Sequence, residues 1–296
     1  MSQVVTVTGA TGHVGSELVR RLVERGVRVR AVARNAERLK ALGDVEVHAG
    51  SVEDGAFLTQ AFTGADAVFA IVPPSYGEKD FRAYQRRVAD AIAAALAAAR
   101  VSRVVTLSSV GADRDGGNGP IAGLHDLEKR LEAVPGLHIV HLRPTFFMEN
   151  ELNAIGLIKS AGIMGSPLKA DQAIPMVAAR DIAEVAAGLL APATFTGRTM
   201  REILGPRDYS PRETTRVLGS SIGKPELPYV EFSYDDTKKA LLAAGMSEDV
   251  AGKFVEMYEA FNEHRVQSLQ GRSAATTTAT GLDTFAKEVW APAFQA

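Results

Sequence analysis

The stretch Thr8-Gly9-Ala10-Thr11-Gly12-His13-Val14-Gly15 follows the strand-like run Val4–Val7 and leads into a helical pattern over His13–Arg25. The first glycine lets the chain turn tightly off the strand, the second lets backbone amides approach a pyrophosphate, and the third lets the helix pack close to the sheet. The start of the helix adds unpaired N–H groups and the positive end of a dipole. Because a strand precedes the glycines and a helix follows them, the stretch predicts a dinucleotide-binding loop. The residues expected to contact the dinucleotide here are Gly9, Thr11, Gly12, His13, Val14 and Gly15.

The first half of the chain alternates short β-branched runs with longer helical patterns, which is typical of a parallel sheet covered by helices on both faces. Strands are predicted at Val4–Val7, Val27–Val32, Val45–His48, Ala67–Val72, Val104–Leu107 and His138–Leu142. The helices between them are predicted at His13–Arg25, Gly55–Phe62, Phe81–Arg100 and Ile121–Ala133. We therefore expect an α/β fold with a doubly wound parallel Rossmann sheet in strand order 3-2-1-4-5-6.

The second half has a different rhythm, with shorter elements separated by glycines and prolines. It predicts a smaller, mixed α/β C-terminal substrate domain over the carboxyl ends of the strands. The Rossmann domain is expected to span 1–148, with 174–192 returning to it, and the smaller domain to comprise 149–173 and 193–296. Ser268–Gly281 is rich in Ser, Thr, Ala and Gly, so we expect a mobile linker there. The apolar residues Leu282, Phe285, Val289, Trp290 and Phe294 are expected to dock the C-terminal tail.

Composition excludes several classes of function. The net charge of −2 gives no electrostatic footprint for nucleic acid or an anionic membrane, so neither is expected as a partner. The absence of cysteine removes disulfides, thiolate metal sites and a cysteine nucleophile, and no His/Asp/Glu group has metal-ligand spacing. The N-terminus has no leader pattern and no apolar run is long enough to span a bilayer. We expect a cytoplasmic protein without a metal, present as a monomer or a homodimer.

The residues after the second predicted strand bear on the choice of dinucleotide. An NAD site usually carries an Asp or Glu there for the ribose hydroxyls, whereas this chain has Ala33-Arg34-Asn35. A guanidinium can pair with a 2′-phosphate, so Arg34 favours NADP(H) over NAD(H), unless it is only a solvated residue at a strand end. Further cofactor contacts are expected where other strands end, at Ser51, Val52, Val72, Pro73, Ser108, Ser109 and Phe146.

Taken together, these motifs resemble the NmrA-like group of the atypical short-chain dehydrogenase/reductase superfamily. The resemblance covers nearly the whole chain. Besides the glycine loop and Ala33-Arg34-Asn35, it includes Leu142-Arg143-Pro144, Phe146-Phe147-Met148-Glu149-Asn150, Ala179-Arg180-Asp181-Ile182-Ala183 and Phe285-Ala286-Lys287-Glu288-Val289. It implies a relationship to NADPH-dependent quinone reductases, triphenylmethane and azo-dye reductases, and NADP-sensing regulators.

The sequence departs from the superfamily at its acid/base pair, Tyr-x-x-x-Lys. The matching stretch is Ile121-Ala122-Gly123-Leu124-His125, with Ile121 at the tyrosine position and His125 at the lysine position. The NmrA-like reductases are similar in carrying a histidine here. His125 is the candidate catalytic residue, expected to orient the nicotinamide ribose or donate a proton, the alternative being a helix-surface histidine without a role. Without the pair, an ordinary alcohol or sugar dehydrogenase, or a related epimerase, is disfavoured.

The leading hypothesis is an NADPH-dependent reductase whose partner is a small conjugated electron acceptor, such as a quinone. Such an acceptor is already electrophilic and mainly has to be held against the nicotinamide in an apolar slot. The residues expected to line that slot are Pro74, Tyr76, Phe147, Met148 and Asn150. The alternative is a non-catalytic NADP(H) sensor that acts through a protein partner, which would keep the same loop and explain the missing tyrosine equally well.

Overall fold

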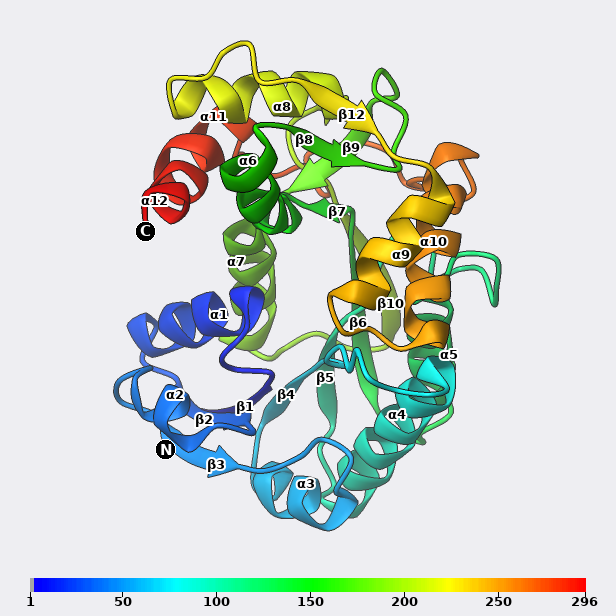
Figure 1. Cartoon of the computed structure of the whole chain (residues 1–296). Helices are drawn as coiled ribbons and strands as arrows, with labels where there is room; N and C mark the ends of the chain where they lie inside the picture. The colour runs from blue at the N-terminus through cyan, green and yellow to red at the C-terminus, as the bar shows by residue number, and fades with distance from the viewer. Residues whose placement is uncertain (1–2) are drawn as a thin grey trace.

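The computed structural model describes residues 3–296, and a sheet of seven parallel strands forms its centre (Figure 1). In chain order the strands are β1 (Val4–Thr8), β2 (Arg28–Ala33), β3 (Glu46–Ala49), β4 (Ala67–Ala70), β5 (Arg103–Leu107), β6 (His138–Pro144) and β10 (Arg198–Ile203). They are arranged as β10-β6-β5-β4-β1-β2-β3. The predicted order 3-2-1-4-5-6 is therefore confirmed, and a seventh strand extends it beside β6.

Helices cover both faces of this sheet. One face is covered by α1 (His13–Glu24) and α7 (Ala179–Leu190), and α2 (Ala36–Lys40) lies near its edge. The other is covered by α3 (Gly55–Phe62), α4 (Phe81–Ala98) and α5 (Ile121–Glu132). The two-residue period of a strand decides which side chain faces which layer. In β4, Phe69 belongs to the core beneath α1 and α7, whereas Val68 belongs to the core beneath α3, α4 and α5.

A partly buried ionic cluster of one carboxylate and two arginines joins α4 to α5. Asp126 accepts hydrogen bonds from Arg82, at 2.8 and 3.1 Å, and from Arg86, at 2.7 Å. Burial by itself would raise the pKa of Asp126, but the hydrogen bonds from the two arginines outweigh it and hold the pKa at about 2. The carboxylate is therefore ionised at any pH at which the fold is expected to be stable.

The smaller half lies over the carboxyl ends of the strands, above the sheet in Figure 1. It has one three-stranded sheet, β11-β9-β7, and one two-stranded sheet, β12-β8. The strands are β7 (Phe146–Phe147), β8 (Met164–Ser166), β9 (Ile174–Val177), β11 (Asp208–Tyr209) and β12 (Tyr229–Glu231). The helical segments are a 3₁₀ stretch (Met148–Ala154), α6 (Ile155–Ala161), α8 (Pro211–Ser221), α11 (Leu282–Phe285), a π-helical turn (Ala286–Trp290) and α12 (Ala291–Gln295). Leu282, Phe285 and Trp290 are fully buried in its core, so the end of the chain docks there.

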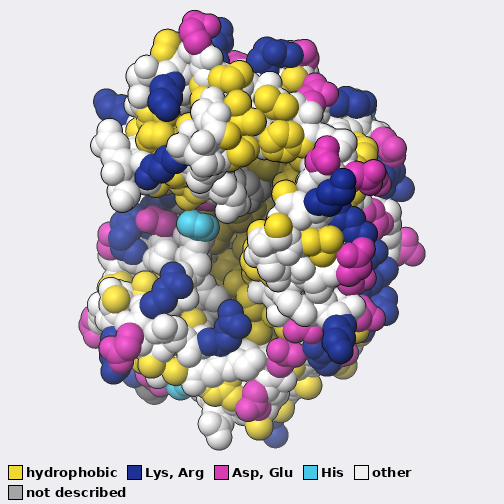
Figure 2. Space-filling model, in the orientation of Figure 1, with side chains coloured by type: hydrophobic (Ala, Val, Ile, Leu, Met, Phe, Trp, Pro, Cys, Tyr) yellow, Lys and Arg dark blue, Asp and Glu magenta, His cyan; other side chains and the backbone are white. Residues whose placement is uncertain are grey.

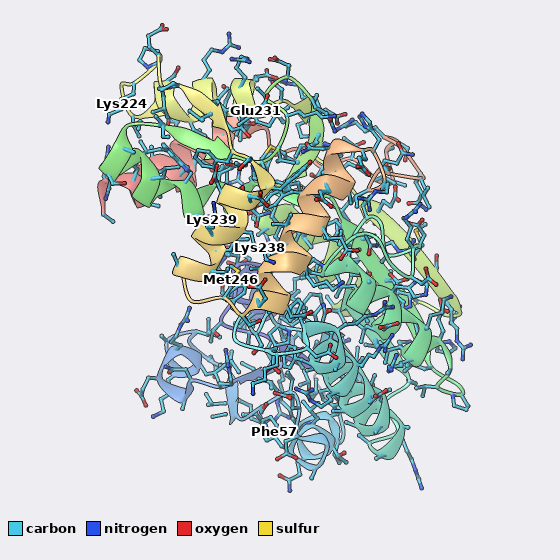
Figure 3. All side chains as sticks on the ribbon, turned by 45° about the vertical axis from the view of Figure 1, so that its right-hand side comes forward. Phe57, Lys224, Glu231, Lys238, Lys239 and Met246 are labelled. Carbon is cyan, nitrogen blue, oxygen red and sulfur yellow. The ribbon has the colours of Figure 1, made fainter. Side chains whose placement is uncertain are left out.

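The helix pair α9 (Tyr234–Ala243) and α10 (Glu248–Asn262) lies beside both halves, and Figure 3 shows Lys238 and Lys239 on α9 and Met246 in the turn that leads to α10. Backbone contacts fix the start of α10. Ser247 N donates to Tyr76 O at 2.9 Å, and the carboxylate of Asp249 accepts from Phe81 N at 2.8 Å. These bonds hold α10 against the segment that follows β4.

The boundaries between the halves differ from the expected ones. Strand β10 lies within 193–296 but completes the main sheet, because it pairs with β6 throughout Arg198–Ile203. Phe146 and Phe147 pair with Met176 and Val177, so β7 and β9 belong to the smaller sheet rather than to the Rossmann sheet. Of the segment 174–192, α7 packs on the main sheet together with Val177 at the end of β9. Strand β10 is an edge strand rich in charged residues, which explains why an apolar pattern did not predict it.

The expectation of a mobile linker at Ser268–Gly281 is wrong. The buried carboxylate of Glu202 accepts hydrogen bonds from Ser268 Oγ, Leu269 N and Gln270 N. Further along, Thr280 donates to Asp181 through both its hydroxyl, at 2.7 Å, and its N–H, at 3.0 Å. Short polar side chains therefore attach this segment to β10 and α7, a role that composition alone does not distinguish from flexibility.

Candidate functional site

The glycine loop between β1 and α1 has one position at which a side chain would meet no obstacle. Gly9 has a φ of +65°, and a Cβ there would lie 2.0 Å from Ile71 Cδ1. A Cβ at Gly15 would lie 2.1 Å from Gly9 O, so the helix packs too closely on the loop for any side chain. At Gly12 the nearest atom to a Cβ is Gly9 O at 3.4 Å, an ordinary contact, and φ is −86°. The fold therefore requires glycine at 9 and 15, whereas nothing within the described part of the protein requires it at 12.

The N-terminus of α1 supports an anion at this position. No side chain caps the helix, and no acidic residue lies in its first turn. Basic groups surround the loop instead: Arg38 Nη2 donates to Thr11 O at 3.1 Å, and Arg34 is exposed immediately after β2. With unpaired N–H groups, a positive helix end and two guanidiniums, the loop fits a phosphate-bearing dinucleotide.

The predicted cofactor residues at the other strand ends lie along the same edge of the sheet, because the strands are parallel. Ser51 accepts a hydrogen bond from Glu53 N at 3.2 Å and closes the turn after β3, and Val52 is buried next to it. Val72 and Pro73 follow β4, and Pro73 O accepts from the hydroxyl of Tyr84 at 3.0 Å. Burial raises the pKa of Tyr84 to about 12, so that phenol stays protonated.

A cavity of about 360 Å³ opens where β4, β5 and β6 end. Figure 2, drawn in the orientation of Figure 1, shows a deep groove with a hydrophobic floor on the face of the molecule turned toward the viewer. The predicted residues that line the cavity are Val72, Pro74, Tyr76, Ser108, Ser109, Phe146, Phe147 and Asn150. The glycine loop and the cavity are both at this edge of the sheet, since β1 and β4 are neighbours.

Met148 does not belong to this set. Its side chain is fully buried and packs in the core of the smaller half, so the prediction that it lines the substrate slot is wrong. The 3₁₀ stretch that begins at Met148 turns successive side chains in different directions, so this methionine enters the core while Asn150 reaches the cavity.

Ser108 has an internal partner. Its hydroxyl donates to Glu128 Oε1 at 2.5 Å, and the same carboxylate receives Arg143 through Nε at 2.9 Å and Nη2 at 2.5 Å. Arg143 donates these two hydrogen bonds to Glu128 as a bidentate pair, and they raise the pKa of Arg143 further above its usual value, despite its burial. This network joins the ends of β5 and β6 to α5. The hydroxyl of Ser108 therefore stabilises the wall of the cavity and is not directed at a reacting atom.

The first turns of α5 contribute apolar side chains to the cavity. Ile121 and Leu124 line it, whereas His125 does not. The Nδ1 of His125 lies 2.8 Å from the carbonyl oxygen of Ala112, which as an acceptor fixes Nδ1 as the donor. The structure therefore does not bring His125 into the wall of the cavity and gives no support to a catalytic role for this residue.

Helix α10 supplies a wall that the sequence analysis did not predict. Phe254, Met257 and Phe261 line the cavity, and the ring of Phe261 meets that of Phe146 edge-on at 5.9 Å. These three residues recur at intervals of three and four along a helix that otherwise reads as polar. That spacing was the available signal, because it places the three side chains on one face.

Neither a metal centre nor a membrane span is found in the described part of the chain. Within residues 3–296, no group of three or more His, Asp or Glu side chains is arranged to hold a metal ion. No helix in the same range combines the length and the apolar character needed to cross a bilayer.

Fold and loop together define a dinucleotide-binding protein of the short-chain dehydrogenase/reductase type. The model of the NmrA-like family matches residues 1–286, and the chain belongs to that family. It is 34% identical over 240 residues to a (4-alkanoyl-5-oxo-2,5-dihydrofuran-3-yl)methyl phosphate reductase of Streptomyces griseus, covering 81% of this chain and 80% of the relative. It is 29% identical over 258 residues to an NAD(P)H azoreductase of Xenophilus azovorans, covering 86% of each. Among solved structures, triphenylmethane reductase of Citrobacter sp. complexed with NADP(H) superposes with a TM-score of 0.79 at 22% identity, covering 96% of this chain and 99% of that one.

Proposed function

We propose that this protein is an NADPH-dependent reductase that transfers hydride to a small conjugated acceptor, such as a quinone. The observation that carries the proposal is the composition of the first cavity. It lies at the edge of the sheet where the dinucleotide loop lies, and most of its wall is apolar, with contributions from the segment after β4 and from β7, α5 and α10. Ile121 lines this cavity, and it is the residue that we assign to the position of the superfamily's proton-transferring tyrosine.

An acceptor of this kind suits such a wall. A conjugated ring system takes up a hydride without prior protonation, and the anion that results is stabilised by conjugation and takes a proton from water. For a neutral acceptor the reaction then consumes one NADPH and one proton for each two-electron reduction, whereas a cationic acceptor becomes neutral on taking up the hydride and needs no proton. The relatives reported above are named for reductions of a dihydrofuranone, of azo compounds and of triphenylmethane dyes, which are all conjugated acceptors.

The residues of the chain have three tasks in this proposal. Nicotinamide, when bound, supplies the hydride. The glycine loop, Arg34 and Arg38 hold the phosphates, and the guanidinium of Arg34 favours the 2′-phosphate of NADP(H). Phe146, Phe254 and Phe261 hold a flat acceptor in place and exclude water, so that the reacting atoms stay in contact.

Purified protein mixed with NADPH and a panel of quinones, azo dyes and triarylmethane dyes tests the proposal, with absorbance followed at the nicotinamide band. We expect turnover with at least one acceptor and a clear preference for NADPH over NADH. No oxidation of NADPH above background with any acceptor, together with cofactor-dependent capture of a protein partner, would instead favour the sensor.

A further inference from the structure

A second cavity adjoins the first. Its volume is about 530 Å³, and five residues line both: Tyr76, Phe146, Asn150, Phe254 and Met257. Beyond these shared residues the second cavity extends into the smaller half, with walls from the 3₁₀ stretch, β8, β12 and the turn between α9 and α10. Met246, labelled in Figure 3, lines it from that turn. A ligand held in the first cavity therefore has room to extend into the second.

Glu151 is the one charged side chain among the residues that line the second cavity, and no Lys, Arg or His accompanies it. Its backbone oxygen accepts a hydrogen bond from Trp290 Nε1 at 3.2 Å, which fixes the position of this residue in the 3₁₀ stretch. Its carboxylate has no hydrogen bond and no ion pair with any residue in the range 3–296. Burial alone raises the pKa of this carboxyl to about 7.

The rest of the wall is mostly aromatic and apolar, with the neutral polar residues Asn150, Asn153, Ser166 and Thr214 among the lining residues. Tyr209, Tyr229 and Tyr258 line it together with Met164 and Met176. The hydroxyl of Tyr229 donates to Leu168 O at 2.8 Å, and that of Tyr209 accepts from Leu282 N at 3.0 Å. Because the hydroxyl of Tyr229 already has a partner in the protein, the part of that side chain that remains for a ligand is its ring, whereas the guanidinium of Arg207 already lies over the ring of Tyr209, at 4.0 Å from its centroid.

An isolated carboxylate is costly in such a place unless a cation accompanies it. Within the described chain, no Lys, Arg or His lines the cavity, so for the ionised form of this carboxylate a cationic group of a ligand can serve as the counterion. Aromatic rings attract cations through their electron-rich faces, and one carboxylate among several rings is a combination that suits an ammonium or iminium group.

We propose that the second cavity binds the cationic nitrogen of an aromatic amine or iminium ligand, with its charge paired to Glu151 and its apolar part against the tyrosines. This inference deepens the proposed function, on which it rests for its chemistry: it names cationic aromatic compounds as the preferred acceptor class. Binding in this cavity can nevertheless be measured without NADPH and without turnover.

The test compares two ligands that differ only in charge. One is (2-naphthylmethyl)trimethylammonium, and the other is its uncharged carbon isostere 2-neopentylnaphthalene, each titrated by naphthalene fluorescence. At a pH well above 7 we expect the wild-type protein to bind the cation about tenfold more tightly. Glu151→Gln should abolish that preference, whereas Glu226→Gln, which removes an exposed carboxylate from the same half, should leave it unchanged.

A second arm uses only the wild-type protein and so remains decisive if the variant fails to fold. The ammonium is permanently charged, so any change of preference with pH comes from the protein. The other titratable groups that line the cavity are Tyr76, Tyr209, Tyr229 and Tyr258. The preference for the cation should fall as the pH is lowered through about 7, where Glu151 takes up a proton.

Equal affinity for the two ligands above pH 7 would overturn the inference, as would a preference that survives in Glu151→Gln, or no binding of either ligand. A protein that binds the cation as expected but oxidises NADPH with no acceptor would retain this site and lose the proposed function. Turnover of neutral quinones without any cation preference would do the reverse.

Discussion

Replacement of Gly12 by alanine separates the needs of the fold from those of the cofactor. Of the three loop glycines, Gly12 alone has an ordinary φ, −86°, together with room for a Cβ, whose nearest neighbour would be Gly9 O at 3.4 Å. The apo protein should therefore tolerate a methyl group at this position. A dinucleotide should not, because the methyl lies over the helix start to which its pyrophosphate would bind.

The expected magnitudes differ for folding and for binding. Alanine reduces the freedom of the unfolded chain, which stabilises the fold by about 0.4–1 kcal/mol, but it is a poorer N-cap than glycine by a similar amount. The free energy of unfolding should thus change by less than about 1 kcal/mol. Loss of one charge-assisted hydrogen bond to a phosphate costs about 2 kcal/mol, so the dissociation constant for NADPH should rise roughly 30-fold.

Gly15→Ala provides the contrast. Its Cβ would lie 2.1 Å from Gly9 O and 3.0 Å from Ala10 Cα, and both are backbone atoms that cannot move aside easily. We expect it to lower the free energy of unfolding by about 2 kcal/mol, even after the gain in helix propensity. Gly188→Ala, on an exposed position of α7 with nothing within 4 Å of its Cβ, should leave NADPH binding unchanged and raise the free energy of unfolding by roughly 0.5–1 kcal/mol through helix propensity alone.

The assays are calorimetric titration with NADPH and urea unfolding monitored by circular dichroism, each on all three variants and the wild type. The reasoning is refuted if Gly12→Ala folds normally and binds NADPH within about threefold of the wild type, a difference below 1 kcal/mol. It also fails if Gly12→Ala unfolds as readily as Gly15→Ala, since the geometry would then be wrong.

Four further predictions follow from other parts of the structure. Arg34→Glu should weaken NADPH binding by roughly 10- to 100-fold, as expected for loss of hydrogen bonds to a charged group, and leave NADH binding nearly unchanged; an equal loss for both in titrations would show that Arg34 does not read the 2′-phosphate. Glu128→Gln should lower the free energy of unfolding by about 3–5 kcal/mol, because it leaves the charge of Arg143 buried and unpaired; a urea midpoint like that of the wild type would contradict this. The depressed pKa of Asp126, about 2, should contribute about 2 kcal/mol to the free energy of unfolding at any pH above the unfolded pKa near 4. In an acid titration the wild type should lose this stability as the pH falls through 2, whereas Asp126→Asn should not show that loss. Phe254→Ala should raise KM for a flat acceptor about tenfold without changing the affinity for NADPH, whereas a parallel loss of both would indicate that α10 had moved.

The main sheet could be predicted from the sequence because its signals are local. Each of the first six strands is a short β-branched run, and the loop from Gly9 to Gly15 combines a strand, glycines and a helix in one stretch. A parallel sheet also places the ends of its strands along one edge, so residues as distant as Val72 and Phe146 could be assigned to one cavity.

The remaining parts depend on contacts between distant residues. Strand β10 is recognised only through its pairing with β6, and Ser268 is ordered only through the buried carboxylate of Glu202. Neither His125 nor Met148 could be oriented from the sequence, because a shift of one residue along a helical turn moves a side chain from the cavity to another surface. The second cavity is formed where the 3₁₀ stretch meets α10, more than 90 residues later in the chain, so no single motif predicts it.

The central claim is that a dinucleotide bound at the glycine loop delivers hydride to an acceptor in the apolar cavity. A single-turnover measurement tests it most directly: excess protein is loaded with NADPH that carries deuterium at the transferred position of C4, and its oxidation on mixing with an acceptor is compared with that of unlabelled NADPH. The account predicts rapid oxidation, slower for the deuterated cofactor, that is lost in Gly12→Ala and restored by saturating NADPH. Oxidation at the same rate with either cofactor, or no oxidation with any conjugated acceptor, would contradict it.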